Sequence, residues 1–267
     1  YQRTNMEITA LRKLLEVDKL CKCIKNANEL TVLINNLSFE ICYGEAVAMI
    51  CPSESRLTQL LGLLSGLNRQ YEGLIRYHPD IENQLHYKIL YTCNKDAIYE
   101  WRTVLDNTLL FLEVNSSEDV NKAELNQYVL ETFEKYKLTK YKDKYPTSLS
   151  GSIKSKISLI KHMMLKPDLL ILDDNFSNID YKTKIELLQL LRKHFLNENN
   201  AILYATQNID DVFLIADRIL LLTPQPLSVK ATVDLAGMGH ERTPEQVKEN
   251  PAYAELSDVL TNDLMND

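Results

Sequence analysis

The chain has 267 residues, of which 45% are hydrophobic, so it can bury a full core as one large domain or two smaller ones. Its formal net charge of −7 argues against a nucleic-acid-binding protein, because such proteins present a strongly basic face. The sequence shows no signal-peptide pattern and no apolar stretch near the roughly 18 residues that a transmembrane helix needs. We therefore expect a soluble chain that can dock on a membrane protein.

The cysteines are odd in number and lack the spacing of a zinc site. This usage predicts reduced thiols in a cytosolic protein, and a metal or redox site at Cys21 and Cys23 is the alternative. The positions concerned are Cys21, Cys23, Cys42, Cys51 and Cys93.

The first part of the chain is predicted to be mostly β structure. Residues 1–14 are expected to be a leader or an expression remnant. A helix follows a short apolar run, because Leu60, Leu61, Leu64 and Leu67 recur at helical spacing. The predicted segments are strands over 14–20, 31–41 and 45–50, a helix over 58–67, and further β structure over 72–93.

The second part of the chain alternates between helices and apolar strands. Residues 101–138 have a helical pattern with a polar break at 115–119, and Ser150 is placed to cap a helix that runs to about residue 165. The remaining predicted segments are strands over 167–174, 200–206 and 218–223 and helices over 181–196 and 210–217. Such alternation predicts an α/β fold with a parallel sheet.

A strand, a tight loop and a helix at "CPSESRLT" (51–58) are the setting of a phosphate-binding loop. The glycines and the lysine that such a loop uses are absent. Glycines allow backbone N–H groups to wrap phosphates, and the lysine supplies a point charge. The stretch is therefore either a nucleotide site that has lost its chemistry or no such site at all.

Several ordered pieces of the chain together resemble the ATP-binding subunit of an ABC transporter, most of all the nitrate/taurine/sulfonate-type importers. "YPTSLSGSIKSKISLIKHMMLKPDLLILDDNFSNID" resembles the signature motif, helix, Walker B strand and D-loop of that family. "WRTVLDNTLL" resembles the segment after the Q-loop, and "AILYATQNIDDVFLIADRILLL" resembles the switch-histidine strand with the helix beyond it. The tail "RTPEQVKENPAYAELSDVLTNDL" resembles the C-terminal extension of those importers.

The resemblance implies a P-loop NTPase-like ABC ATPase domain over residues 15–225. That domain would contain an antiparallel β subdomain and a helical subdomain at about 101–165. Residues 226–267 would form the C-terminal extension.

The phosphate loop departs from the family pattern G-x-x-G-x-G-K-[ST]. Cys51, Glu54 and Arg56 replace glycines, and Leu57 replaces the lysine. Losing one attraction and gaining one repulsion, each about 3 kcal/mol at roughly 5 Å, would cost about four decades of affinity. Arg56 can compensate in part, and Thr58 keeps the hydroxyl that faces Mg²⁺. We expect this degenerate loop to bind ATP weakly or not at all. It comprises Ser53, Glu54, Ser55, Arg56, Leu57, Thr58 and Gln59.

The other motifs of this chain's own ATP site also depart from the family pattern. Ile24 falls near the position of the adenine-stacking aromatic, and Asn94 takes the place of the Q-loop glutamine at a magnesium position. Asp173 keeps the Walker B carboxylate, which with Thr58 and Asn94 makes the third magnesium position, while Asp174 stands at the catalytic glutamate and is one methylene shorter. Gln207 replaces the switch histidine. The alternative is that Asp173 and Asp174 merely cap the next turn.

The signature motif is better preserved. Ser150 and Gly151 are kept, whereas Ser152 and Ile153 depart from the pattern. In the family, the signature of one subunit closes on the ATP held by the phosphate loop of its partner. Ser150, Gly151 and Ser152 are therefore expected to contact the partner's ATP, and ATP and Mg²⁺ are the cofactors of that composite site. This chain's own site would be empty or weakly occupied.

The resemblance implies a catalytically degenerate subunit of a heteromeric ABC importer. Its expected partners are a competent ABC ATPase subunit, transmembrane permease subunits and an extracytoplasmic solute-binding protein, with the chain peripheral on the cytoplasmic face of the plasma membrane. Tyr99, Trp101 and Arg102 would face the permease, although a plain core role for Trp101 stays open. The alternatives are a regulatory or scaffolding pseudo-ATPase and a weak genuine ATPase that uses Arg56 and Asp174.

Overall fold

A computed structural model describes residues 12–26, 29–51, 54–82, 88–93, 98–115, 121–176, 179–239 and 242–265. Within these ranges, no helix combines the length and the apolar character needed to cross a membrane. Each of the five cysteines lies in a described segment and is a free thiol, with Cys42 and Cys51 buried.

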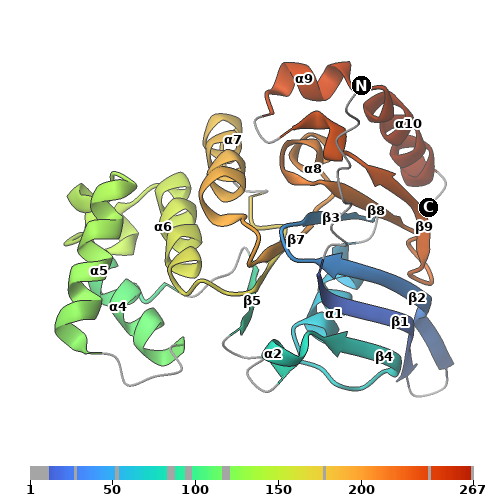
Figure 1. Ribbon diagram of the computed structural model, residues 1–267, viewed down its shortest axis with the longest axis horizontal. Helices are drawn as coiled ribbons and strands as arrows, with labels where there is room; N and C mark the ends of the chain where they lie inside the picture. The colour runs from blue at the N-terminus through green and yellow to red at the C-terminus, as the bar shows by residue number, and fades with distance from the viewer. Residues whose placement is uncertain are drawn as a thin grey trace, which may run out of the picture.

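Two sheets form the centre of the fold (Figure 1). Among the described residues, six strands form the main sheet, which is parallel except for its last strand, β9, antiparallel to β8. In sheet order these strands are β5 (Ile89–Cys93), β6 (Leu169–Asp173), β7 (Ala201–Ala205), β3 (Ala46–Ile50), β8 (Arg218–Leu222) and β9 (Val229–Asp234). Every residue of β3, β6 and β7 is buried, as expected for parallel strands covered on both faces.

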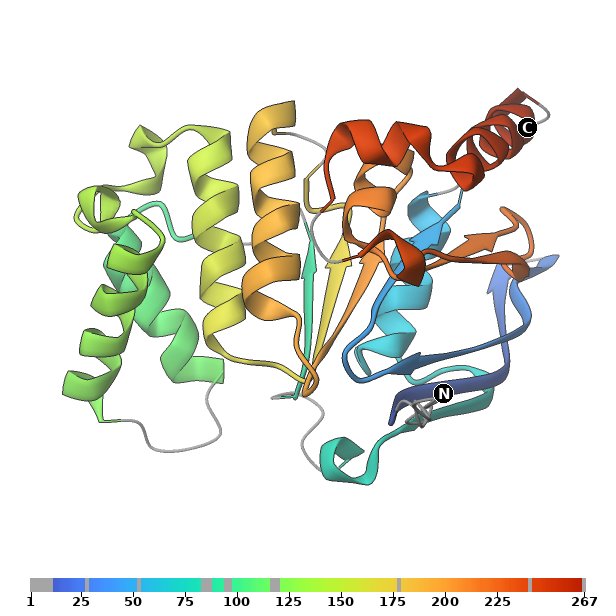
Figure 2. The same ribbon diagram turned by 45° about the horizontal axis from the view of Figure 1, so that its top comes forward.

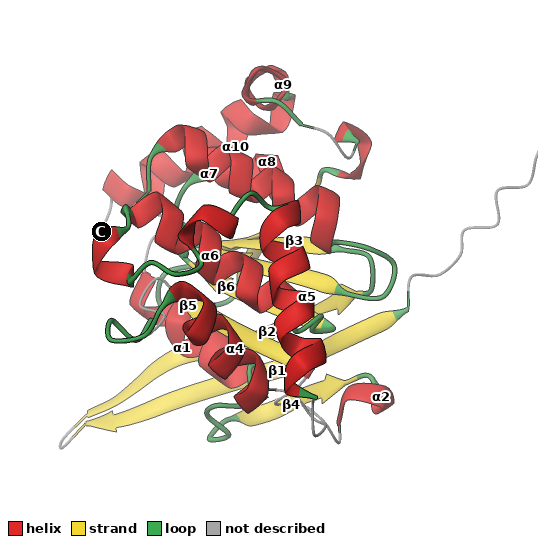
Figure 3. Cartoon of the chain, turned by 90° about the vertical axis from the view of Figure 1, so that its left-hand side faces the viewer, coloured by secondary structure: helices red, strands yellow, loops and turns green. Residues whose placement is uncertain are grey.

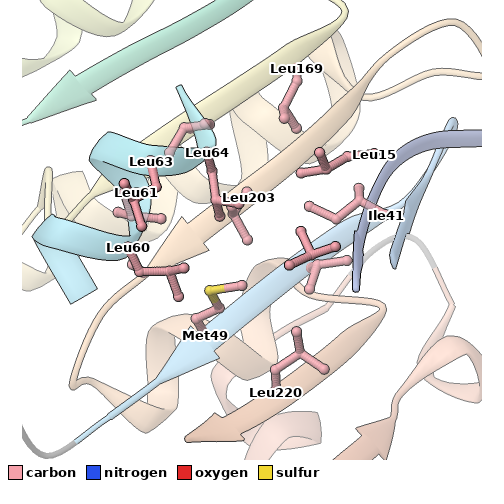
Figure 4. Packing of buried hydrophobic residues seen from close by; sticks show 14 of the residues in the cluster. Leu15, Ile41, Met49, Leu60, Leu61, Leu63, Leu64, Leu169, Leu203 and Leu220 are labelled. Carbon is pink, nitrogen blue, oxygen red and sulfur yellow. The ribbon is translucent and has the colours of Figure 1, made fainter. Parts of the chain in front are cut away.

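The second sheet is antiparallel and has the order β2–β1–β4. Its strands are β1 (Lys13–Asn26), β2 (Glu29–Cys42) and β4 (Glu72–Tyr77). Helix α1 (Glu54–Leu64) lies between this sheet and the main sheet. Figure 4 shows its leucines packed among Leu15 and Ile41 of the antiparallel sheet and Met49 and Leu203 of the main sheet.

Helices form two further layers around the main sheet (Figure 2). On the side of β5, α4 (Val104–Asn115), α5 (Lys122–Lys135) and α6 (Gly151–Met164) share a separate hydrophobic cluster. The main sheet's other face is covered by α7 (Tyr181–Leu190) and α8 (Ile209–Ile215). The C-terminal helices α9 (Pro244–Glu249) and α10 (Pro251–Met265) pack against α8. In the view of Figure 3, helices α4, α5 and α6 lie in front of the strands of the main sheet.

The predicted α/β fold with a parallel sheet is confirmed, and several element bounds are corrected. The helix predicted over 58–67 begins at Glu54 and ends at Leu64, and Leu67 is 74% exposed. It ends there because Gly66, at φ +76°, adopts the left-handed conformation that closes a helix. The β structure predicted over 72–93 is interrupted by the short helix α2 (Pro79–Glu82).

The other predicted elements differ from the structure mainly at their ends. The predicted helix over 181–196 is α7 followed by a π-helical turn at Leu191–Phe195. The predicted helix over 210–217 is α8, Ile209–Ile215. The pattern of the tail did not predict β9, α9 or α10. Short 3-10 turns at Thr139–Tyr141, Pro146–Ser148 and Ala236–Met238 complete the described elements.

Candidate functional site

The carboxyl ends of four parallel strands bring the candidate site residues to one edge of the main sheet. Met49 pairs with Ala205, Ala205 with Asp173, and Asp173 with Cys93, so these strands end level with one another. A backbone hydrogen bond also joins the ends of β6 and β7: the Asp174 N–H donates to the Ala205 carbonyl at 2.9 Å. The segments that follow the strands therefore meet here, which is where open α/β sheets bind ligands. Asn94 and Ser53 belong to this edge by sequence but lie outside the described residues.

The phosphate-loop segment enters α1 with its lysine-position side chain turned into the core. Leu57 is 2% exposed and belongs to the same cluster as Leu60, Leu61 and Leu64. Glu54 and Ser55 form the first turn of α1, and Thr58 and Gln59 are exposed. The segment thus keeps the strand–loop–helix course, with an apolar anchor where the family has a cation.

Arg56, the predicted compensating cation, is held by the protein. Its Nη2 donates a hydrogen bond to Oε1 of Gln225, in the segment between β8 and β9. Its Nη1 is buried and finds no acceptor among the described residues. One arm of the guanidinium is therefore already committed within the chain.

Asp173 ends β6 and is 9% exposed. The hydroxyl of Tyr91, on the neighbouring strand β5, donates to Asp173 Oδ2 at 2.6 Å. The sequence reasoning missed Tyr91. Periodicity places Tyr91 on the same face of β5 as Cys93, but only the strand register shows that Cys93 pairs with Asp173.

Asp174 and Asn175 follow directly and bend the chain away from the sheet. Asp174 has φ +47°, a left-handed conformation that aspartate tolerates better than most residues. Asn175 Nδ2 donates to Thr92 Oγ1 at 3.0 Å, and its Oδ1 is buried with no donor among the described residues. The next helix is capped by Asp180, so neither Asp173 nor Asp174 is its N-cap.

Gln207 and Ile24 are the residues that the resemblance assigns to the switch and adenine positions. Gln207 is exposed just beyond β7, and Asn208 after it caps α8 by accepting from the Asp211 N–H at 3.1 Å. Ile24 is half-buried in β1, opposite Thr31, and packs against the core cluster around α1. The adenine position is therefore occupied by an aliphatic side chain that contributes to packing.

The signature residues form the start of α6. Ser150 is its N-cap and accepts from the Ile153 N–H at 3.4 Å. Gly151 is exposed, and a Cβ added there would meet nothing within 4 Å, so open space lies in front of the first turn. Ser152 donates instead to Asp180 within its own chain, at 2.5 Å. In Figure 1, α6 and α1 lie on opposite sides of β5.

The turn at 99–102 presents aromatic side chains to solvent. Trp101 is 73% exposed and Tyr99 41%, with ring centroids 5.1 Å apart, and Arg102 is exposed as well. The side chain of Asn107 fixes the turn, accepting from the Tyr99 N–H at 2.8 Å and donating to the carbonyls of Tyr99 and Arg102 at 3.0 Å. A plain core role for Trp101 is therefore wrong.

A cavity of about 230 Å³ lies beside this turn, between α6 and the ends of β5 and β6. Thr92 and Asn175 line it from the strands, Lys154 from α6, and Glu100 from the turn itself. The exposed aromatic turn and the strand edge are thus connected by a polar hollow.

Comparison with known proteins agrees with this geometry. The family model described as ABC transporter matches residues 34–177, more than half of the chain. The chain therefore belongs to the ABC transporter family, as an ATP-binding domain. Members of this family bind ATP with Mg²⁺, and their ATP-binding subunits work with membrane permeases.

Individual relatives share moderate identity. The chain is 24% identical over 250 residues to the uncharacterized ABC transporter ATP-binding protein YtlC of Bacillus subtilis (strain 168), covering 94% of this chain and 95% of that protein. It is 29% identical over 204 residues to the sulfate/thiosulfate import ATP-binding protein CysA of Escherichia coli (strain K12), covering 75% of this chain. It spans only 56% of the length of that CysA.

Solved structures share the fold. A dimeric bacterial ABC transporter cassette superimposes with a TM-score of 0.71 at 21% identity, covering 83% of this chain and 99% of the cassette. The ATP-binding subunit of another ABC transporter gives a TM-score of 0.70 at 20% identity. The predicted ABC ATPase fold, with its antiparallel sheet and helical elements, is confirmed.

Proposed function

We propose that this chain is a non-catalytic subunit of a heteromeric ABC importer that lends its signature motif to the ATP site of a competent partner ATPase. The observation that carries the proposal is the contrast between two helix starts. At α1 the lysine position is filled by Leu57, 2% exposed, whereas at α6 Ser150 and Gly151 face open space.

The chain's own site is a poor fit for Mg-ATP. The Walker B carboxylate of Asp173 already accepts a hydrogen bond from Tyr91, and Arg56 is held by Gln225. Without a lysine, nothing at position 57 balances the charge of the β- and γ-phosphates. Under this proposal, Asp174 and Gln207 of this chain take no part in ATP hydrolysis.

The start of α6 has the chemistry of an anion site for a partner's nucleotide. The helix has 14 residues, and its N-terminus carries unpaired N–H groups and the positive end of the helix dipole. The Ser150 hydroxyl accepts from Ile153, which leaves its own hydrogen free to donate to a phosphate oxygen. A partner loop carrying ATP would complete this site.

The importer assignment rests on similarity and on one surface. The resemblance to nitrate/taurine/sulfonate-type importers agrees in kind with the sulfate/thiosulfate importer named among the relatives. The exposed Tyr99–Trp101–Arg102 turn is the proposed contact with a permease, and this surface favours a transporter subunit over a soluble scaffold. The proposed assembly also includes an extracytoplasmic solute-binding protein and lies at the cytoplasmic face of the membrane.

A weak ATPase within this chain is the less supported alternative. It needs Arg56 to reach a phosphate while donating to Gln225, and Asp174 to act one methylene short of a glutamate. It would also bind Mg²⁺ through a carboxylate, Asp173, whose Oδ2 already accepts a hydrogen bond from Tyr91.

The test compares two substitutions in the complex purified through a tag on this chain. Ser150→Arg places a bulky side chain where the partner's γ-phosphate must sit, so ATP hydrolysis should fall to background. Asp174→Asn should leave hydrolysis within about twofold of wild type, a change worth less than about 0.5 kcal/mol in the barrier.

Asn121→Ala is the matched control for loss of a helix cap. Asn121 caps α5 as Ser150 caps α6, and losing either cap costs about 1 kcal/mol of stability. The control should retain full hydrolysis. Full activity of Ser150→Arg, or loss of activity in Asp174→Asn, would show that the proposal assigns the working site to the wrong subunit.

A further inference from the structure

A single carboxylate joins the start of α6 to the start of α7. Ser152 Oγ donates to Asp180 Oδ2 at 2.5 Å, and Asp180 Oδ1 accepts from the Thr183 N–H at 3.0 Å. Asp180 is the N-cap of α7, and Ser152 lies in the first turn of α6. Both oxygens of Asp180 are thus in use, one for each helix.

This contact lies at the end of α6 that holds none of the buried residues of the hydrophobic clusters. Ile157 and Ile160 of α6 belong to the cluster of helices α4–α6, and Leu159 and Met163 join Leu187 of α7 in the cluster on the main sheet. These buried residues of α6 all lie beyond its first turn, so the Ser152–Asp180 hydrogen bond fixes the start of the helix, where neither cluster has a buried residue.

The acceptor in this bond is an ionised carboxylate at neutral pH. The Ser152 hydroxyl, and after it the Thr183 N–H, lower the pKa of Asp180 to about 2. The carboxylate is therefore ionised throughout the physiological range, and a hydrogen bond to an ionised acceptor is stronger than one between neutral groups.

We propose that Ser152 is a positioning residue: its bond to Asp180 holds the first turn of α6 so that Ser150 and Gly151 are presented in one orientation without any nucleotide in this chain's own loop. The effect on ATP hydrolysis rests on the proposed function. The Ser152–Asp180 hydrogen bond itself is a property of the isolated chain. A glycine, which the family signature has at this position, has no side chain with which to make the bond.

The Ser152–Asp180 hydrogen bond is tested first in the isolated full chain, by measuring hydrogen exchange of the α6 backbone amides. Ser152→Ala should speed the exchange of the Ile153 and Lys154 amides about tenfold, the loss expected for a hydrogen bond to a charged acceptor. Ser152→Thr keeps the hydroxyl and should restore slow exchange. Ser155→Ala, one turn further along the same helix, is the matched control and should leave these amides unchanged.

The consequence is tested in the tagged complex by the kinetics of ATP hydrolysis. Ser152→Ala should raise the KM for ATP about fivefold with kcat nearly unchanged, because the signature must be ordered each time the partner's site closes. A merely structural role would reduce the active fraction, and hence the apparent kcat, without moving KM. Ser152→Thr should return KM to the wild-type value.

The two assays separate this inference from the proposed function. If amide exchange is unchanged in Ser152→Ala, or if Ser152→Thr does not restore slow exchange, the Ser152–Asp180 bond does not order the first turn of α6. Faster exchange with an unchanged KM, in a complex that Ser150→Arg inactivates, overturns the positioning role. If Ser150→Arg is fully active, the proposed function fails, and the exchange result still decides whether the Ser152–Asp180 bond orders the first turn of α6.

Discussion

Two side chains near the strand ends contact groups of the protein itself, at positions that the resemblance assigns to phosphate and magnesium binding. Leu57 packs with the leucines of α1, and the Tyr91 hydroxyl donates to one oxygen of Asp173. The missing lysine predicted the loss of a charge at position 57, but not the burial of Leu57 in the core. The Tyr91 contact was not predicted, because a tyrosine in an apolar strand carries no mark of the carboxylate beside it until the strand register is known.

At the residue scale, we expect the isolated chain to bind Mg-ATP too weakly for a saturable signal below the millimolar range. Leu57 supplies no charge, and Arg56 would have to break its bond to Gln225. The loss of about four decades estimated from charge alone moves a micromolar site beyond that range. Isothermal titration calorimetry measures this, and a low-micromolar dissociation constant would contradict it.

At the element scale, the apolar strands and amphipathic helices followed from their periodicity, whereas their ends depended on single residues. Gly66 ends α1 three residues earlier than the leucine spacing predicted. The turn before α4 was predicted as a surface from the resemblance, but its rigidity comes from Asn107, whose amide binds three carbonyls of the turn. No local pattern marks an asparagine for that role.

We predict that Trp101→Ala leaves the fold intact and prevents assembly with the permease. Trp101 is 73% exposed, so its removal should change the free energy of unfolding by no more than about 0.5 kcal/mol. An exposed aromatic side chain of this kind is typically a main source of binding energy at an interface. Urea unfolding and co-purification with the membrane subunits measure the two effects.

Val114→Ala is the matched control, since Val114 is 70% exposed on α4 and lies outside the turn. It should assemble normally. If Trp101→Ala also assembles and supports transport, the tryptophan is not part of the permease contact.

At the scale of the whole molecule, the C-terminal segment is built into the main sheet and its covering helices. β9 pairs with β8, and the Tyr253 hydroxyl of α10 donates to Asp210 of α8 at 2.6 Å. Arg242, 2% exposed, donates to the carbonyls of Phe213 and Ala216. The division of the chain at residue 225 remains a prediction, made from a resemblance that does not reveal these contacts.

Arg242→Ala should lower the free energy of unfolding by about 3–5 kcal/mol, because it strips donors from several buried carbonyls and from Asp217. Arg76→Ala is the control. Arg76 is exposed and pairs with Glu16 at 2.9 Å on the surface, so its loss should cost at most about 1 kcal/mol. Equal midpoints for the two variants in urea would show that the hydrogen bonds of Arg242 contribute no more to stability than a surface ion pair.

The burial of Leu57 also bears on how this chain can change over generations. A single reversion to lysine would place an ammonium group among Leu60, Leu61 and Leu64, where burial of an unpaired charge is strongly unfavourable. Such a reversion would lose stability at once and gain no nucleotide, because the glycines of the loop would still be missing. Natural selection would therefore remove each single step back, and in the proposed heteromeric complex the hydrophobic core of this chain would preserve its need for a partner ATPase.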